Sequence, residues 1–411
     1  MGRRKEFFME QVRRGYYYVG DKYVCKNCFS DTAIKRYIHL YATNKKCDYC
    51  GRKTKSKFIS VPTDDIVGLI VRCIEHEWGD PNDERILFED GDWQGDVISS
   101  WELLHDEIEI PTENKKLQND ILKSIGDRQW CRINYYGVPP HEVLRYSWED
   151  FCHFVKHHSR YVFLRYALPK DPWNDPDLIP SNRMLDELSK AINRIGLVRT
   201  IPANTKFTRV RFHYSTVVYD TAEKLGPPSE ELAKYSNRMS PAGIPMFYGS
   251  TDKKTSIIET IQKGDERKNM ATVAIFKTIK PFKILDLTKL PECPSLFDED
   301  QREQRNLIGF LESFVRDVSR SISKDGREHI EYVPTQIFTE YFRYLFRDDD
   351  NDHIHGILYR SSKHRRGVCC VLFFTDKHFS NSTDKDQKNK WLSLDIKALK
   401  TVNISKYYKE I

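Results

Sequence analysis

The segment 237–248 and a carboxylate beyond it combine residue types that can do chemistry. Arg238 stands on a turn that contains Pro and Gly, Tyr248 ends the short apolar run that follows, and Glu259 lies eleven residues further on. The planar fork of an arginine makes bidentate hydrogen bonds to phosphate. A carboxylate stabilises the positive charge that develops when a ribosyl bond breaks. These residues predict a pocket for a phosphorylated, ribose-containing ligand such as NAD.

A second pattern comes from cysteines near the start of the chain. Cys25 and Cys28 form one C-x2-C pair, and Cys47 and Cys50 form another after eighteen intervening residues. This spacing is typical of a four-thiolate zinc site. A catalytic zinc needs an open coordination position and usually His or carboxylate ligands, so we expect structural zinc that holds together a small segment with little core of its own.

The elements that must position these residues change in character along the chain. Helical patterns follow Asp64 and recur near 115–126 and 147–158, whereas short strand-like runs alternate with helices beyond Thr205. We therefore expect an α+β protein, with a mostly helical N-terminal half and a mixed α/β second half. The expected parts are a zinc-knuckle segment at 1–60, a helical domain at 61–166, a Pro-rich linker and helix at 167–204, a catalytic domain at 205–376 and a C-terminal extension at 377–411.

The charge of the chain is unevenly distributed. The formal net charge is +6, but residues 1–60 hold fifteen Lys and Arg against five Asp and Glu, whereas residues 61–120 hold four against seventeen. The basic segment is expected either to dock on its acidic neighbour or to bind nucleic acid. The first interpretation is favoured, because bulk charge carries little specificity.

The hydropathy of the chain indicates where the protein works. It contains no run of 18 uninterrupted apolar residues, and the basic residues 3–5 precede no apolar segment of signal-peptide length. The ten cysteines occur without secretory context, which argues against a disulfide framework. We expect a cytoplasmic protein without a membrane partner.

The second half carries a series of motifs in a fixed order. They are Lys206 to Phe212, Arg238 to Tyr248, Thr255 to Glu259, Ile284 to Thr288, Tyr332 to Gln336 and His355 to Ser362. Over about residues 205–375 this series resembles the RES domain family. The resemblance implies an ADP-ribosyltransferase-like fold and a toxin or defence enzyme that degrades NAD as its substrate. It leaves open whether the bond is cleaved by hydrolysis or by phosphorolysis, and whether ADP-ribose is instead transferred to a protein or nucleic acid.

The resemblance also implies roles for individual residues. Glu259, Arg238 and Tyr248 are expected to be catalytic. The residues expected to bind substrate are Arg209, Arg211, Ser361 and Ser362, with Ser361 favoured over Ser362. The chain departs from the family pattern at Asn237, where glycine is usual, and at His355, where aspartate usually precedes the Gly-Ile strand.

The N-terminal half resembles the zinc-knuckle HEPN-type domain found ahead of RES domains, on residues 23–29 and 47–51. Some HEPN domains are ribonucleases with an R-x4-6-H motif, but the only such spacing, Arg347 to His353, crosses the acidic segment 348–352. A ribonuclease is therefore disfavoured, and a nucleic-acid-binding module with an inert second half is a further alternative. The sequence leaves open a protein antitoxin, inhibitor or trigger, the oligomeric state, and the roles of 348–352 and the C-terminal extension.

Overall fold

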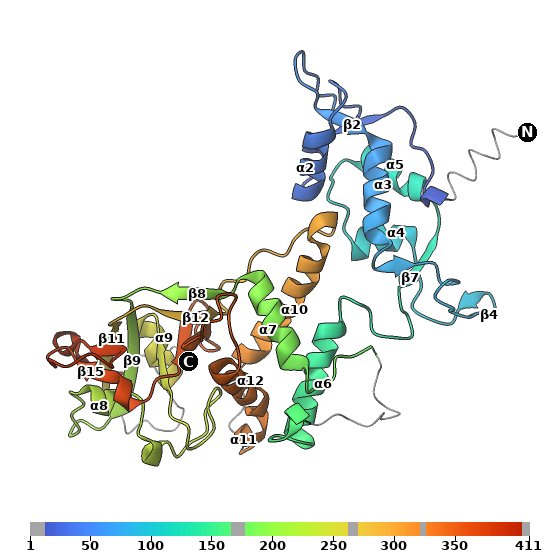
Figure 1. Ribbon diagram of the computed structural model, residues 1–411. Helices are drawn as coiled ribbons and strands as arrows, with labels where there is room; N and C mark the ends of the chain where they lie inside the picture. The colour runs from blue at the N-terminus through green and yellow to red at the C-terminus, as the bar shows by residue number, and fades with distance from the viewer. Residues whose placement is uncertain (1–12, 166–176, 262–269, 321–325, 405–411) are drawn as a thin grey trace, which may run out of the picture. The chain divides into compact units, whose positions relative to one another are not determined.

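The computed structural model describes residues 13–165, 177–261, 270–320 and 326–404. The chain divides into two compact units (Figure 1). The first consists of Met1–Val143, Asp175–Asp177 and Glu292–Asn306; the second consists of Leu144–Asn174, Leu178–Pro291 and Leu307–Ile411. None of the described helices has the length and apolar composition needed to span a membrane. The expected α+β class is confirmed, and the proline-rich residues 167–176 of the predicted linker lie outside the described residues.

Helices and very short sheets build the first unit. Its elements are β1 (Tyr23–Cys25), α2 (Thr32–Tyr41), β2 (Ser60–Pro62), α3 (Thr63–Ile74), β3 (Trp78–Gly79), β4 (Phe88–Glu89), β5 (Asp92–Trp93), β6 (Ile98–Ser99), α4 (Ser100–Glu102), α5 (Lys115–Ile125) and β7 (Gln129–Arg132). β1 pairs with β2, β4 pairs with β5, and β7 lies between β3 and β6. The core is centred on α3, whose residues are almost all buried.

Local sequence signals explain the two helices of this unit that were predicted most closely. The side chain of Asn114 accepts a hydrogen bond from the N–H of Leu117 and so caps α5, while Leu117 and Ile121 face the core. Gly126 ends the helix with a φ of 80°, a conformation that glycine adopts without strain. α3 begins at Thr63, so that the two aspartates after it lie in the first turn, where they favour the helix dipole.

One large sheet organises the second unit. Its strands are β8 (Val198–Ile201), β9 (Lys206–His213), β10 (Phe247–Ser250), β11 (Met270–Thr278), β12 (Phe282–Asp286), β13 (Gly356–Arg360), β14 (Val368–Leu372), β15 (Phe379–Asn381), β16 (Leu392–Leu394) and β17 (Lys400–Asn403). The order is β15-β16-β11-β9-β10-β14-β13-β12-β8, and β17 also pairs with β11. The β12–β13 and β15–β16 pairs are parallel and the others antiparallel, which makes the sheet mixed. Three of its strands lie beyond residue 376, in the predicted C-terminal extension.

Helices accompany this sheet. They are α6 (Val143–His157), α7 (Met184–Ile195), α8 (Ala222–Leu225), α9 (Lys253–Thr260), α10 (Arg302–Ser319), α11 (Glu328–Glu331) and α12 (Val333–Tyr344). α6 contributes Trp148, Phe151 and Val155 to the largest core cluster of this unit. The Trp148 ring meets the Phe314 ring of α10 edge-on, with 4.9 Å between the ring centroids. α6 is therefore part of the second unit's core.

Both faces of the central strands are buried. On β10, β13 and β14, the residues Tyr248, Ile357 and Val371 belong to one core cluster. Their direct neighbours Phe247, Leu358 and Leu372 belong to another. Since side chains alternate along a strand, the two clusters lie on opposite faces of the sheet. The cluster of Tyr248 is also the one that contains α6, α7, α10 and α12.

The acidic segment 348–352 folds around a lysine. Lys283 Nζ on β12 lies 2.5 Å from Asp348, 2.7 Å from Asp350 and 2.9 Å from Asp352. The Asp348 side chain also accepts hydrogen bonds from the backbone N–H groups of Asp350 and Asp352. These three carboxylates therefore surround the ammonium group of Lys283 and tie the loop before β13 to β12.

Candidate active site

The helix that carries Glu259 is fastened to the sheet by hydroxyl groups. Asp252 caps α9 by accepting a hydrogen bond from the N–H of Thr255 at 2.9 Å. Behind it, Ser256 Oγ lies 2.6 Å from Ser250 Oγ and donates to the carbonyl of Thr208 at 2.7 Å. Because Ser250 ends β10 and Thr208 lies in β9, α9 is fixed to two adjacent strands.

Glu259 lies at the last turn of α9 and meets Ser361, the residue after β13. Ser361 Oγ donates a hydrogen bond to Glu259 Oε1. The same Oγ accepts from the backbone N–H of His364 at 2.9 Å and of Lys363 at 3.2 Å. Because the Ser361 hydroxyl accepts two backbone N–H groups, its own hydrogen is directed toward Glu259 and orients the Glu259 carboxylate. Ser361 links α9 to β13, which are far apart in the sequence.

Arg238 lies on a loop that α12 holds in place. Thr335 Oγ1 donates to the carbonyl of Arg238 at 2.6 Å, and Gln336 Nε2 donates to the carbonyl of Asn237 at 2.8 Å. The Arg238 guanidinium donates from Nη1 to the carbonyl of Val318, near the end of α10, at 3.2 Å. The motif Tyr332 to Gln336 thus has a structural role, because two of its side chains hold the loop that carries Arg238.

Tyr248 on β10 lies next to this loop. Its hydroxyl is 2.8 Å from Ser240 Oγ. Burial raises the pKa of Tyr248, although the hydrogen bond with Ser240 and the positive charges of Arg209 and Arg238 oppose that shift. The phenol is therefore neutral near pH 7, and its ring packs against the core cluster on that face.

Two residues without an expected role complete this region. Burial raises the pKa of Tyr359 on β13 and of Cys369 on β14. The negative charge of Glu259 raises both pKa values further, and the positive charge of Arg238 lowers both. Glu259 and Arg238 are therefore near the same two side chains. The sequence could have indicated that Tyr359 lies near the site. Tyr359 stands two residues before Ser361, and side chains two residues apart along a strand point to the same side.

Arg209 and Arg211 lie on the other face of the sheet. The Arg209 guanidinium is 5.1 Å from the ring centroid of Phe247, which belongs to the cluster opposite Tyr248. Arg211 donates to the carbonyl of Gly226 at 3.0 Å. Burial lowers the pKa of Arg209, and the charge of Arg211 lowers it further. Val210 between them packs with Ile257 of α9, as alternation requires.

The structure therefore groups the predicted site residues unequally. Ser361 is hydrogen-bonded to Glu259, and the charges of Glu259 and Arg238 act on the pKa values of both Tyr359 and Cys369, which lie opposite each other across β13 and β14. Tyr248 also acts on the pKa of Tyr359. Arg209 and Arg211 are separated from Glu259 by the sheet, and Ser362 is exposed to solvent. Substrate binding by these three residues stays a prediction.

A cavity of about 390 Å³ adjoins Arg238. The residues that line it are Trp148, Glu149, Cys152, His153, Lys156, His157, Arg238, Asp317, Val318, Arg320, Glu331, Pro334 and Thr335. α6 thus forms one wall, and the ends of α10, α11 and α12 form the others. Lys156 Nζ crosses to Glu331 at 2.7 Å and ties α6 to α11. This volume is within the roughly 300–1,000 Å³ of ligand pockets.

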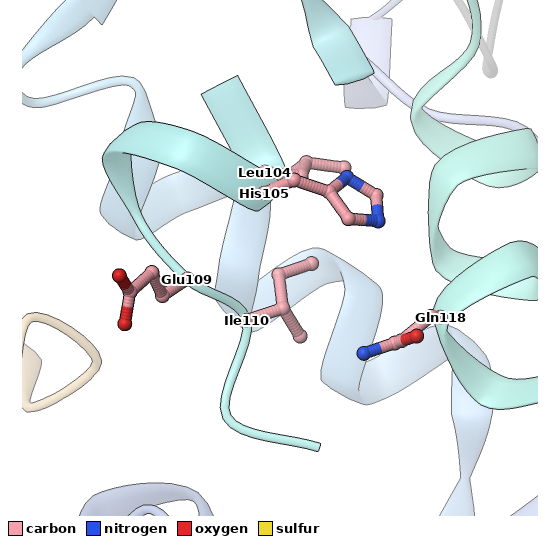
Figure 2. Close-up of a pocket in the computed structure, with 5 residues that line it drawn as sticks. All are labelled: Leu104, His105, Glu109, Ile110 and Gln118. Atoms are coloured by element: carbon pink, nitrogen blue, oxygen red, sulfur yellow. The ribbon is translucent and has the colours of Figure 1, made fainter. Parts of the chain in front are cut away.

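Another cavity lies in the first unit, lined by Leu104, His105, Glu109, Ile110 and Gln118 (Figure 2). Its volume is about 180 Å³, below the usual range for a ligand pocket. His105 Nδ1 is 2.9 Å from the carbonyl of Trp101, and the two rings stack with centroids 4.7 Å apart. The imidazole is thus held by Trp101 through one ring nitrogen and through its face.

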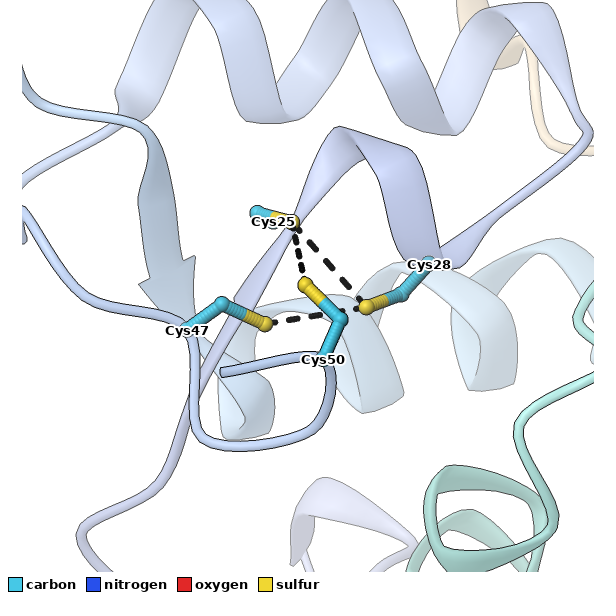
Figure 3. Close-up of side chains that lie close together, drawn as sticks. All are labelled: Cys25, Cys28, Cys47 and Cys50. Carbon is cyan, nitrogen blue, oxygen red and sulfur yellow. Dashed lines mark hydrogen bonds between the residues drawn. The ribbon is translucent and has the colours of Figure 1, made fainter. Parts of the chain in front are cut away.

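The four predicted metal ligands come together in the first unit (Figure 3). Cys25 Sγ lies 4.0 Å from Cys28 Sγ and 3.5 Å from Cys50 Sγ, and Cys28 Sγ lies 3.6 Å from Cys47 Sγ. A zinc ion about 2.3 Å from each of four sulfurs at tetrahedral angles separates them by about 3.8 Å. The observed distances match this edge and far exceed the roughly 2.05 Å of a disulfide. The cluster fits a four-coordinate metal.

Two family models match successive parts of the chain. Residues 41–168 match the family model of HEPN/RES N-terminal domain 1, and residues 208–395 match that of the RES domain. No curated protein and no solved structure matches the chain. α6 lies within the first match although its side chains pack in the core of the second unit.

Proposed function

Because this chain joins a HEPN/RES N-terminal domain to a RES domain, a family of toxin-like domains, we propose that it cleaves the nicotinamide–ribose bond of NAD. The observation that supports the proposal is the hydrogen-bonded, oriented carboxylate of Glu259, with Arg238 acting on the same two side chains, Tyr359 and Cys369, and the half-buried phenol of Tyr248 acting on Tyr359. These groups suit a dinucleotide with anionic phosphates at one end of the reacting ribose and a cationic ring at the other.

Glu259 has the central part in this reaction. As nicotinamide leaves, the ribose carbon gains oxocarbenium character, and a nearby carboxylate stabilises that charge. Ser361 donates to one carboxylate oxygen, so Glu259 enters the reaction already oriented. The remaining oxygen is directed by this hydrogen bond and can accept from a ribose hydroxyl or an attacking water. No metal or second cofactor is needed, since the leaving group is already cationic.

Arg238 and Tyr248 bind the two ends of the substrate. Among the described residues, Arg238 uses one guanidinium N–H on Val318, and a guanidinium carries five donors. The others are suited to the pyrophosphate. Tyr248 offers a neutral ring, which attracts the cationic nicotinamide through its face. In this proposal, the cavity lined by Arg238 takes up part of the dinucleotide.

The N-terminal domain has a supporting and regulatory part in this proposal. α6 lies in the residues matched to the N-terminal family, yet it forms a wall of the cavity at Arg238. In this proposal, α6 is the part of the N-terminal match that supports the substrate site directly. We assign the second unit an ADP-ribosyltransferase-like fold on its mixed, curled sheet, and we assign the four-cysteine cluster a structural zinc.

The test is to incubate the purified protein with NAD and identify the products by mass spectrometry. We expect nicotinamide with free ADP-ribose; nicotinamide with a modified macromolecule would indicate transfer instead. Glu259→Gln and Arg238→Ala are each expected to reduce NAD loss at least about a hundredfold, as removal of a transition-state contact does. Glu223→Gln, on an exposed position of α8, is the matched control. Unchanged NAD loss in either site variant would contradict the proposal.

A further inference from the structure

The second cysteine pair sits in a hairpin formed by residues 44–59. Lys46 and Lys53 face each other across it in an isolated bridge, and Asn44 bridges to Ser60. Three backbone hydrogen bonds close it: Cys47 N–H to the Arg52 carbonyl at 2.9 Å, Thr54 N–H to the Lys45 carbonyl at 2.9 Å, and Ile59 N–H to the Asn44 carbonyl at 2.8 Å. Together with the cysteine cluster, these bonds give the hairpin a defined shape.

This hairpin is densely basic and exposed. It carries Lys45, Lys46, Arg52, Lys53, Lys55 and Lys57, all of them exposed, and one acidic residue, Asp48. Lys46 Nζ pairs with Asp48 at 2.7 Å. Among the described residues, the other five cations form no ion pair with a carboxylate. A strong positive charge therefore faces solvent on one side of the first unit.

The acidic segment that follows does not neutralise this charge. Its ion pairs with the basic segment are Lys22 to Asp120 and Arg14 to Asp64 in the described part of the chain, and neither involves the hairpin. The basic segment therefore contacts its acidic neighbour through Arg14 and Lys22, and the hairpin cations take no part in these ion pairs. Like charges opposite one another across paired strands, as at Lys46 and Lys53, also destabilise the pairing. A polyanion would relieve that repulsion.

Exposed aromatic rings accompany the cations. Phe58 is 59% exposed, and the Lys45 ammonium lies 5.8 Å from its ring centroid. Tyr41 is 58% exposed, and the chain just after it returns to the base of the hairpin, where the Thr43 N–H bonds the Ser60 carbonyl. Rings beside a basic groove are the platforms on which unpaired bases stack. Duplexes keep their bases inside, so these rings favour a single strand.

A hollow on the same module extends this surface. Its volume is about 570 Å³, and its lining residues are Lys26, Asn27, Phe29, Thr32, Lys35, Arg36 and His39. Lys26 directly follows the cluster ligand Cys25, so the hollow and the hairpin adjoin the same four cysteines. Arg36 is engaged by Asp298 at 2.8 Å, whereas Lys26 has an exposed side chain.

We infer that the module of residues 22–60 binds single-stranded nucleic acid, with the hairpin lysines on phosphates and Phe58 and Tyr41 stacked on bases. This goes beyond NAD cleavage and does not depend on it. Five phosphate contacts by Lys45, Arg52, Lys53, Lys55 and Lys57 would give a salt slope of about −3.5 for a single strand. Affinity is then expected to fall roughly a hundredfold between 50 mM and 200 mM salt.

The test measures fluorescence anisotropy of the full chain with labelled oligonucleotides of about 20 nucleotides, long enough for one binding site. The single-stranded RNA and DNA probes are compared with a duplex of the same sequence. The Glu259→Gln background removes any effect of NAD cleavage. The triple variant Lys53→Gln, Lys55→Gln, Lys57→Gln is expected to reduce the salt slope by about 2. Phe58→Ala is expected to weaken single-strand binding roughly five- to hundredfold, by loss of stacking.

The matched control removes equal charge elsewhere, through Lys385→Gln, Lys388→Gln and Lys397→Gln, all exposed in the second unit. It is expected to leave affinity unchanged, and equal metal content shows that the hairpin variants retain the cysteine cluster. Equal binding by both triple variants would overturn the inference, as would tighter binding of the duplex than of the single strand. Binding of polyglutamate without binding of either single-stranded probe would instead assign the surface to an acidic protein.

Discussion

Ser361 acts on the reaction through Glu259. Its hydroxyl donates to the carboxylate and accepts two backbone N–H groups, so no donor is left for a substrate in this arrangement. The sequence resemblance placed Ser361 among the substrate ligands, whereas the geometry favours a positioning role. The two roles differ in what a substitution changes, because a positioning residue affects the rate constant more than substrate affinity.

Ser361→Ala is expected to lower kcat for NAD cleavage about ten- to hundredfold, the value of a hydrogen bond to a charged group. KM should change little, because Arg238 and Tyr248 are untouched. Ser215→Ala is the matched control, since Ser215 is exposed in the segment after β9 and has no expected role. Steady-state kinetics checks both variants. A rise in KM at constant kcat would show that Ser361 binds the substrate directly.

The two strand arginines show what a sequence cannot decide. Arg209 and Arg211 occupy alternate positions in β9, which predicts that they share a face but not which face. Apolar residues flank them on both sides, because β9 is buried on both. Because neither face of β9 is polar, the sequence does not indicate which face carries the two arginines. The positions of Glu259 and Arg238 were easier to predict, because turn and helix signals in the sequence show that one lies on a helix and the other on a loop.

At the scale of elements, we expect the knuckles of the first unit to depend on a metal held by the four cysteines. β1 and β2 have three residues each, and the hairpin 44–59 adds few backbone bonds. Structural zinc supplies about 10–16 kcal/mol of apparent folding free energy, which such short elements do not supply themselves. The four sulfurs join both knuckles at one point.

Cys47→Ser is expected to abolish zinc binding and to unfold the knuckle segment, with loss of amide protection over residues 22–62. Elemental analysis measures the metal, and hydrogen exchange measures the protection. Cys131→Ser is the matched control, because Cys131 is a buried cysteine of the same unit outside the cluster. It should retain one zinc per chain. Full zinc content in Cys47→Ser would contradict a four-thiolate site.

Long periodic elements were predictable and short ones were not. The helix expected near 115–126 is observed as α5 within one residue of those bounds, since an amphipathic pattern extends over several turns. The two-residue strands β3 to β6 carry no periodicity, so nothing in the sequence indicates them. The acidic segment 348–352 received no role because its partner, Lys283, is remote in the sequence and is itself an ordinary strand residue.

At the scale of the whole molecule, the division into units differs from the order of the sequence. α6 comes from the N-terminal family match but packs in the second unit, and residues 292–306 come from the RES match but belong to the first. Arg72 of α3 pairs with Glu299 at 3.0 Å, and Phe297 lies in the core of the first unit. Domain boundaries predicted from the sequence follow changes in composition along the chain. The assignment of α6 and of residues 292–306 to a unit depends instead on contacts between segments that are remote in the sequence.

This division predicts separate effects of core substitutions in the two units. Phe151, on α6, is fully buried among aromatic rings, 5.2 Å from Trp148 and 5.6 Å from Phe163 between centroids. Phe151→Ala is expected to cost about 3–5 kcal/mol in the second unit, as large-to-small core changes do. Amide exchange should therefore accelerate over β9 to β14, and NAD cleavage should become less heat-stable.

Ile66→Ala in α3 provides the comparison, since Ile66 is fully buried in the first unit. It should accelerate exchange in β1, β2, α3 and α5 and leave the large sheet protected. Hydrogen exchange with mass spectrometry resolves both patterns in the intact chain. If Phe151→Ala loosened α3 and left β9 to β14 unchanged, α6 would belong to the N-terminal domain in energy as well as in sequence.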